Sequence, residues 1–74
     1  MDKLKLVQEI VEQLRMGNPS IAVETTFKGR KTKPLLVAVL VIEVTRELIA
    51  GNNYRLLQQY ESRLNEFHTN NVQF

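Results

Sequence analysis

The 74-residue chain contains no cysteine and no tryptophan, a single histidine, three glycines and two prolines. Without cysteine it can form neither a disulfide nor a thiolate metal site, and its redox compartment stays open. One histidine with no cysteine leaves no residue set for zinc binding or for Cys/His catalysis. The glycines are isolated from one another and form no phosphate-binding loop. We therefore predict no enzymatic activity, no metal and no cofactor.

Long apolar runs are also missing. The longest covers residues 35–42, eight apolar side chains followed by Glu43, whereas a membrane span needs about 20. The charged and periodic N-terminus does not resemble a signal peptide. We expect a soluble cytoplasmic protein with no membrane contact.

The short length predicts one domain. We expect a single small α+β domain over residues 1–68 and a frayed polar C-terminal tail over residues 69–74. A chain of this size buries little of its surface and usually needs a disulfide, a metal or a partner for stability. Since the first two are excluded, the composition favours self-association.

Three segments show helical periodicity. Residues 2–16 carry an apolar stripe that ends at Gly17, and residues 53–67 carry a narrower apolar seam. In residues 34–50 the first position is proline, a glycine follows the last, and the charged side chains gather on one face. We predict a helix over each of the three ranges.

The apolar run within the third helix allows a second interpretation. It is rich in β-branched residues, which favour strands, and periodicity cannot classify a short continuous apolar run. Residues 35–42 could then be a strand. The helix is favoured because no turn residue separates this run from the helical pattern that follows it.

Residues 21–27, with the sequence IAVETTF, alternate like a half-buried β-strand. One strand cannot satisfy its own backbone hydrogen-bonding groups. We therefore predict an α+β fold with the order helix–strand–helix–helix, which forms a homodimer by pairing this strand across a two-fold axis. The alternative is a helix–β-hairpin–helix in which residues 35–42 are the second strand. The predicted dimer or partner interface consists of Val37, Val41, Val44, Leu48, Leu57, Tyr60 and Leu64.

The net charge of +2 hides a local basic cluster. Four cations lie within six residues of the loop 28–33, and the rest of the chain then has six basic and eight acidic residues. Such a loop can contact phosphates and release counterions. The predicted nucleic-acid-binding residues are Lys28, Arg30, Lys31 and Lys33.

These patterns lead to two functional hypotheses. The first is a small homodimeric nucleic-acid-binding accessory or regulatory protein, with transcription regulation as one role, that contacts DNA or RNA phosphates through loop 28–33. The second is a protein-interaction module without catalytic activity, such as an inhibitor, an adaptor or an assembly subunit. In that case the helix over residues 34–50 and the seam on the last helix dock on a protein partner.

Overall fold

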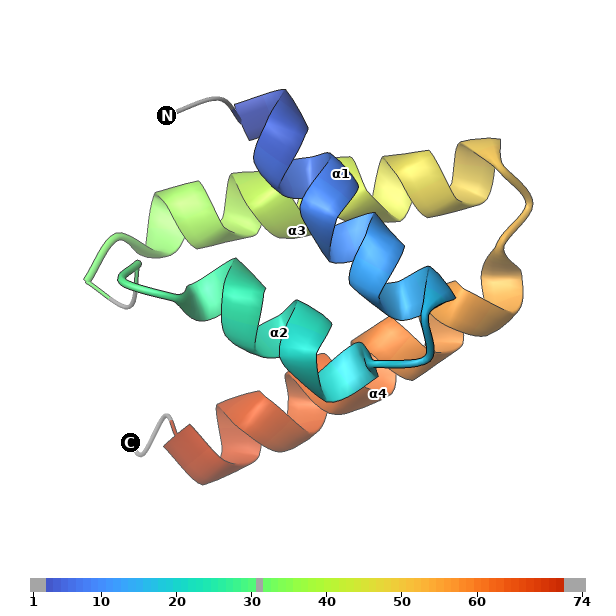
Figure 1. Cartoon of the computed structure of the whole chain (residues 1–74). Helices are drawn as coiled ribbons and strands as arrows, with labels where there is room; N and C mark the ends of the chain where they lie inside the picture. The colour runs from blue at the N-terminus through green and yellow to red at the C-terminus, as the bar shows by residue number, and fades with distance from the viewer. Residues whose placement is uncertain (1–2, 31, 72–74) are drawn as a thin grey trace.

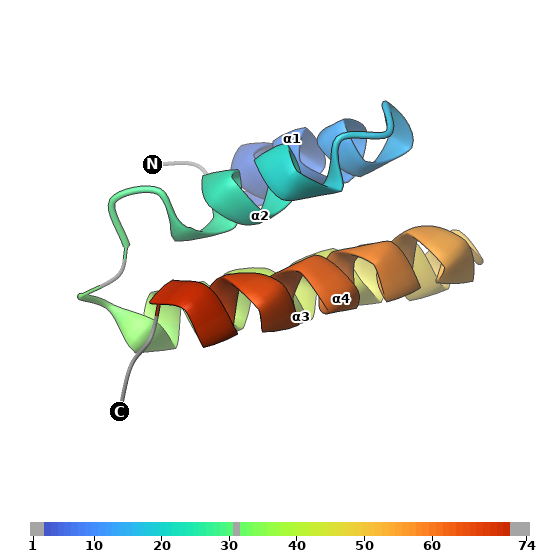
Figure 2. The same cartoon turned by 90° about the horizontal axis from the view of Figure 1, so that it is seen from below.

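The computed structural model describes residues 3–30 and 32–71. Its elements are four helices: α1 (Lys3–Arg15), α2 (Pro19–Phe27), α3 (Pro34–Ala50) and α4 (Tyr54–Asn71) (Figure 1). Figure 2 shows two layers, with α1 and α2 in one and α3 and α4 in the other. Within the described ranges there is no strand. The predicted α+β fold is therefore wrong, both with strands paired between copies and as a β-hairpin.

The segment predicted to be a strand, residues 21–27, belongs to α2. Alternation would place Ala22 and Thr26 together with Glu24 on the outer face, but Ala22, Val23 and Thr26 are buried and Glu24 is exposed. Buried positions spaced by three and four are the pattern of a helix. The β propensity of the β-branched residues here is a weak preference that packing overrides. Because a helix satisfies its own backbone, the segment needs no partner strand.

Chain reversal between α1 and α2 depends on Gly17. Its φ of +80° is left-handed, and its N–H donates to Leu14 O at 3.1 Å while the Asn18 N–H donates to Gln13 O at 2.9 Å. This pair of bonds closes a helix C-terminus on a left-handed residue. Pro19 then occupies the first turn of α2, where its missing N–H is tolerated. These few residues turn a second helix back along the first.

Helix α3 confirms the helical prediction for residues 34–50. Its inner face buries Val37, Leu40, Val44 and Leu48, so the alternative of a strand over residues 35–42 is wrong. At its end Asn52, with φ of 57°, adopts the left-handed conformation that asparagine tolerates. Helix α4 runs to Asn71, beyond the expected end at residue 67. The last three residues of the predicted tail, 72–74, lie outside the described part of the chain.

The core lies between the two layers. Its largest fully buried side chains come from all four helices: Tyr60, Ile10, Leu14, Leu40, Leu48, Val23 and Val44. The rings of Phe27 and Phe67 stack with centroids 4.4 Å apart and join the end of α2 to α4. Each helix thus buries its main apolar face against the other helices.

One buried polar pair links α2 to α4. Thr26 Oγ1 donates to Ala22 O at 2.9 Å and lies 2.8 Å from the Tyr60 hydroxyl oxygen. Because the single Thr26 hydroxyl proton is used on Ala22, the Tyr60 O–H donates to Thr26. Burial raises the pKa of Tyr60 to about 12, against a smaller lowering by its bond with Thr26. The pair is closed off from solvent and acts as a structural link.

Candidate interaction surfaces

The basic loop between α2 and α3 does not present all its cations to solvent. Arg30 is only 9% exposed, and its Nη1 donates to Thr25 O at 2.8 Å and to Lys28 O at 2.7 Å. These carbonyls lie at the C-terminal end of α2, where a cation offsets the negative end of the helix dipole. Arg30 therefore holds the end of α2. Lys28 and Lys33 are exposed, and Lys31 lies outside the described residues.

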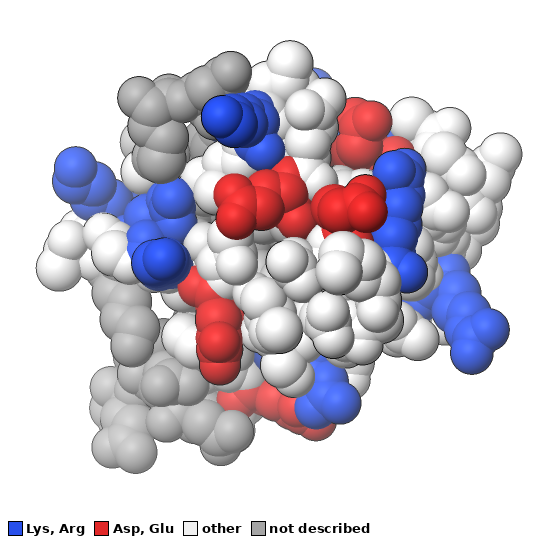
Figure 3. All heavy atoms as spheres, viewed as in Figure 1, with Lys and Arg blue, Asp and Glu red and all other residues white. Residues whose placement is uncertain are grey.

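Charge on the face of Figure 3 is mixed. Basic and acidic side chains are interleaved there and do not separate into one basic field (Figure 3). A continuous basic stripe is the electrostatic footprint of a nucleic-acid surface. Among the described residues of loop 28–33, only two cations are exposed, Lys28 and Lys33. The mixed charges on this face do not extend them into a continuous basic surface.

The predicted interface residues are largely in the core. Val37, Val44, Leu48 and Tyr60 are buried within the single chain. The remaining three, Val41, Leu57 and Leu64, are half-buried and pack against the core. All seven are buried or half-buried in the single chain, and all but Val37 belong to one core cluster or pack against it. A surface for another molecule has to be sought elsewhere on α3.

The opposite side of α3 carries an exposed apolar row that we name the outer stripe: Leu35, Ala38, Ile42 and Ile49. Leu35 is 78% exposed, Ile42 54% and Ile49 45%, and Ala38 is exposed as well. The three large side chains recur every seven residues, so they lie along one line of the helix. The spacing was visible in the sequence, but there it could not be separated from the buried face of the same helix.

Charges border the outer stripe on one side. Arg46 Nη1 lies 3.8 Å from Glu43 Oε1. A pair of this kind at a solvent-exposed position contributes little to stability. An exposed apolar row with a charged border resembles the contact face of a coiled-coil helix.

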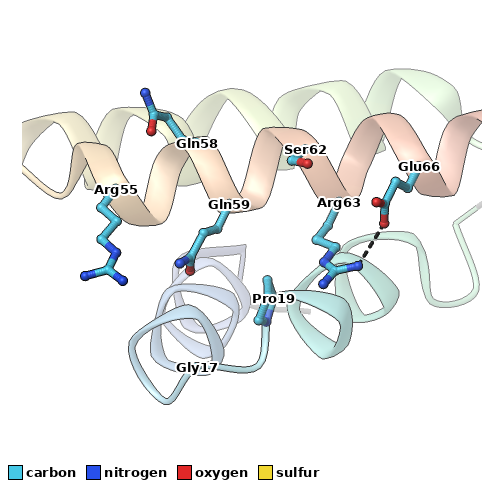
Figure 4. A pocket seen from close by; sticks show the side chains of 8 residues that line it. All are labelled: Gly17, Pro19, Arg55, Gln58, Gln59, Ser62, Arg63 and Glu66. Atoms are coloured by element: carbon cyan, nitrogen blue, oxygen red, sulfur yellow. Dashed lines mark hydrogen bonds and ion pairs between the residues drawn. The ribbon is translucent and has the colours of Figure 1, made fainter.

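An open groove runs between α4 and the turn joining α1 to α2 (Figure 4). Arg55, Gln59 and Arg63 extend toward that turn, and Gln58 points away from it. Arg63 is held by Glu66 at 2.9 Å. The groove is open, and its lining combines amide and guanidinium groups with a comparable area of apolar surface. Its lining side chains offer hydrogen bonds but no nucleophile paired with a base.

The described part of the chain holds neither a cluster of metal-ligating side chains nor a membrane-spanning helix. No group of three or more His, Asp or Glu side chains there is placed to hold a metal ion. Within residues 3–30 and 32–71, no helix combines the length and the apolar character that crossing a bilayer demands. The structure thus defines a small four-helix domain with an exposed apolar seam on α3. Comparison with protein-family models, curated proteins and solved structures gives no match.

Proposed function

We propose that this chain is a protein-interaction module that binds an apolar helical surface through the outer stripe of α3. The observation that carries the proposal is the exposure of Leu35, Ile42 and Ile49 at seven-residue intervals on one helix. Single exposed apolar residues are ordinary on protein surfaces, but a contiguous row with a polar border is typical of an interaction site.

The spacing supports a helix as the shape that is bound. In a heptad repeat these three residues take one seam position, and Ala38 and Thr45 take the other. Ala38 is exposed and Thr45 is half-buried, so the seam is narrow and its second row is small. A facing helix can then approach closely along the whole length of α3.

Site-specific photo-crosslinking tests this proposal. A photo-reactive amino acid replaces Ile42 in the full chain, and the matched control places it at Gln58, which is exposed on α4 and points away from the groove (Figure 4). After irradiation in the cells that naturally make the protein, we expect covalent protein adducts from position 42 and none from position 58. No adduct at position 42, or equal adducts at both, would refute the proposal.

Nucleic-acid binding is the second candidate function. It is favoured by one observation, the exposure of Lys28 and Lys33 on the same short loop. Cations on a loop contact phosphates without reading sequence. It ranks below the first candidate because Arg30 is engaged with backbone carbonyls and because the surrounding charge is mixed.

A further inference from the structure

We infer that the outer stripe is covered by the outer stripe of a second copy of this chain, with the two α3 helices antiparallel across a two-fold axis at Ile42. This inference rests on the proposed function and names its partner. It replaces strand pairing, which the structure excludes, by helix pairing as the route to a homodimer. The register, the side-chain sizes and the charges of α3 each favour this pairing.

The register of the stripe is self-complementary. Leu35 lies seven positions before Ile42 and Ile49 lies seven after it. In an antiparallel pair centred on Ile42, each Leu35 therefore meets Ile49 of the second copy, and the two Ile42 side chains meet each other. Every large exposed residue of the stripe gains an apolar partner. A two-fold interface requires this kind of self-complementary patch.

Side-chain size follows the same symmetry. Ala38 lies four positions before Ile42 and Arg46 lies four positions after it. The alignment therefore places the large Arg46 of one copy at the level of the small Ala38 of the other. The methylene groups of Arg46 can then cover Ala38 while its guanidinium stays at the edge near Glu43. Two large side chains at this level would hold the helices apart.

Charge selects the antiparallel orientation. Helix α3 has no acidic residue in its first turn and no basic residue in its last turn, so its own side chains leave the helix dipole uncompensated at both ends. An antiparallel pair places the positive N-terminal end of each α3 beside the negative C-terminal end of the other, so each dipole offsets its neighbour. A parallel pair would instead bring like ends of the two dipoles together.

The absence of cysteine from the chain makes the register directly testable. Single cysteines introduced at exposed positions of the stripe form disulfides only where two copies meet within about 7 Å between Cα atoms. Under mild oxidation we expect Ile42→Cys alone to form linked dimers. We expect Leu35→Cys alone to stay unlinked, because the two copies of residue 35 would be about 21 Å apart along the helices. A mixture of Leu35→Cys and Ile49→Cys chains should link. Efficient linking of Leu35→Cys alone, or none by Ile42→Cys, would overturn the antiparallel alignment.

Sedimentation equilibrium of the full chain tests the dimer itself. We expect a monomer–dimer equilibrium whose dissociation constant rises at least 100-fold in Ile42→Glu, which places two carboxylates on the two-fold axis. The matched control Gln58→Glu adds the same charge to the exposed surface of α4 and should leave the constant unchanged. Circular dichroism checks that both variants keep their helix content, since Ile42 lies outside the core.

The outcomes separate this inference from the proposed function. A wild-type chain that stays monomeric at several hundred micromolar overturns the homodimer. If position 42 still forms adducts with other proteins in cells, the interaction module stands and only its partner is wrong. If position 42 forms no adduct at all, both ideas fail.

Discussion

The buried link between Thr26 and Tyr60 predicts an unequal response to two small substitutions. In the fold, the Tyr60 hydroxyl donates to Thr26, and Thr26 donates to the carbonyl of Ala22. Tyr60→Phe removes the donor and leaves Thr26 with its bond to Ala22. Thr26→Val keeps the shape of the side chain but leaves the Tyr60 hydroxyl buried without an acceptor.

The two costs differ because an unsatisfied buried group is penalised more than a lost bond. Tyr60→Phe should lower the free energy of unfolding by about 0.5–1.5 kcal/mol, the net contribution of one hydrogen bond. Thr26→Val should lower it by about 1–3 kcal/mol, since both residues are fully buried and the hydroxyl loses its hydration as well. The double variant has no buried Tyr60 hydroxyl left without an acceptor. Its loss of stability should therefore be about 1 kcal/mol smaller than the sum of the losses in the two single variants.

Urea unfolding monitored by circular dichroism measures all four chains of this cycle. In a domain of this length, 1 kcal/mol corresponds to roughly 4–8 °C in the thermal midpoint, which is easily resolved. Tyr54→Phe is the control, because Tyr54 is exposed and its hydroxyl should not matter. Equal costs for the two single variants, or strict additivity in the double variant, would refute the assigned direction of the bond.

Three further predictions follow from other parts of the structure. The pKa of Tyr60 is raised to about 12 from an ordinary value near 10, so ionisation of Tyr60 leaves the free energy of unfolding unchanged below about pH 10. As the pH rises through 12, we expect the free energy of unfolding to fall by roughly 2–3 kcal/mol. Alkaline unfolding curves of Tyr60→Phe should lack this added loss. Gly17→Ala should cost about 1–2 kcal/mol in the free energy of unfolding, because the site has room for a Cβ but a φ of +80°, while the exposed control Ser20→Ala should cost almost nothing. If the chain binds duplex DNA or RNA, Lys28→Gln with Lys33→Gln should lower the slope of log affinity against log salt by about 2 at an unchanged thermal midpoint, and an unaltered gel shift would remove loop 28–33 as the contact.

Helix α3 shows how far local patterns reach. Its predicted range, residues 34–50, agrees with Pro34–Ala50 at both ends, because proline at the start and glycine after the end act on the local backbone alone. The range of α1 was similarly accessible from its periodic stripe and from Gly17. Such signals do not depend on what the helix packs against.

Helix α2 shows where local patterns fail. Seven residues can alternate in polarity by chance, and a helix of only nine residues has too few turns to display its own period. What makes it a helix is its surroundings: Thr26 meets Tyr60 and Phe27 stacks on Phe67. Both contacts come from α4, more than 30 residues away along the chain.

The amino-acid sequence by itself determined where α1 and α3 begin and end, that cysteine chemistry is excluded, and that the cations concentrate in loop 28–33. Only the tertiary structure decided which apolar residues of α3 are buried and which form the outer stripe, and that Arg30 points back to its own loop. The physical reason is that a helix with apolar residues on most of its surface does not show by its own pattern which side will be buried. The packing of α1, α2 and α4 covers Leu40, Val44 and Leu48 and leaves the opposite face exposed.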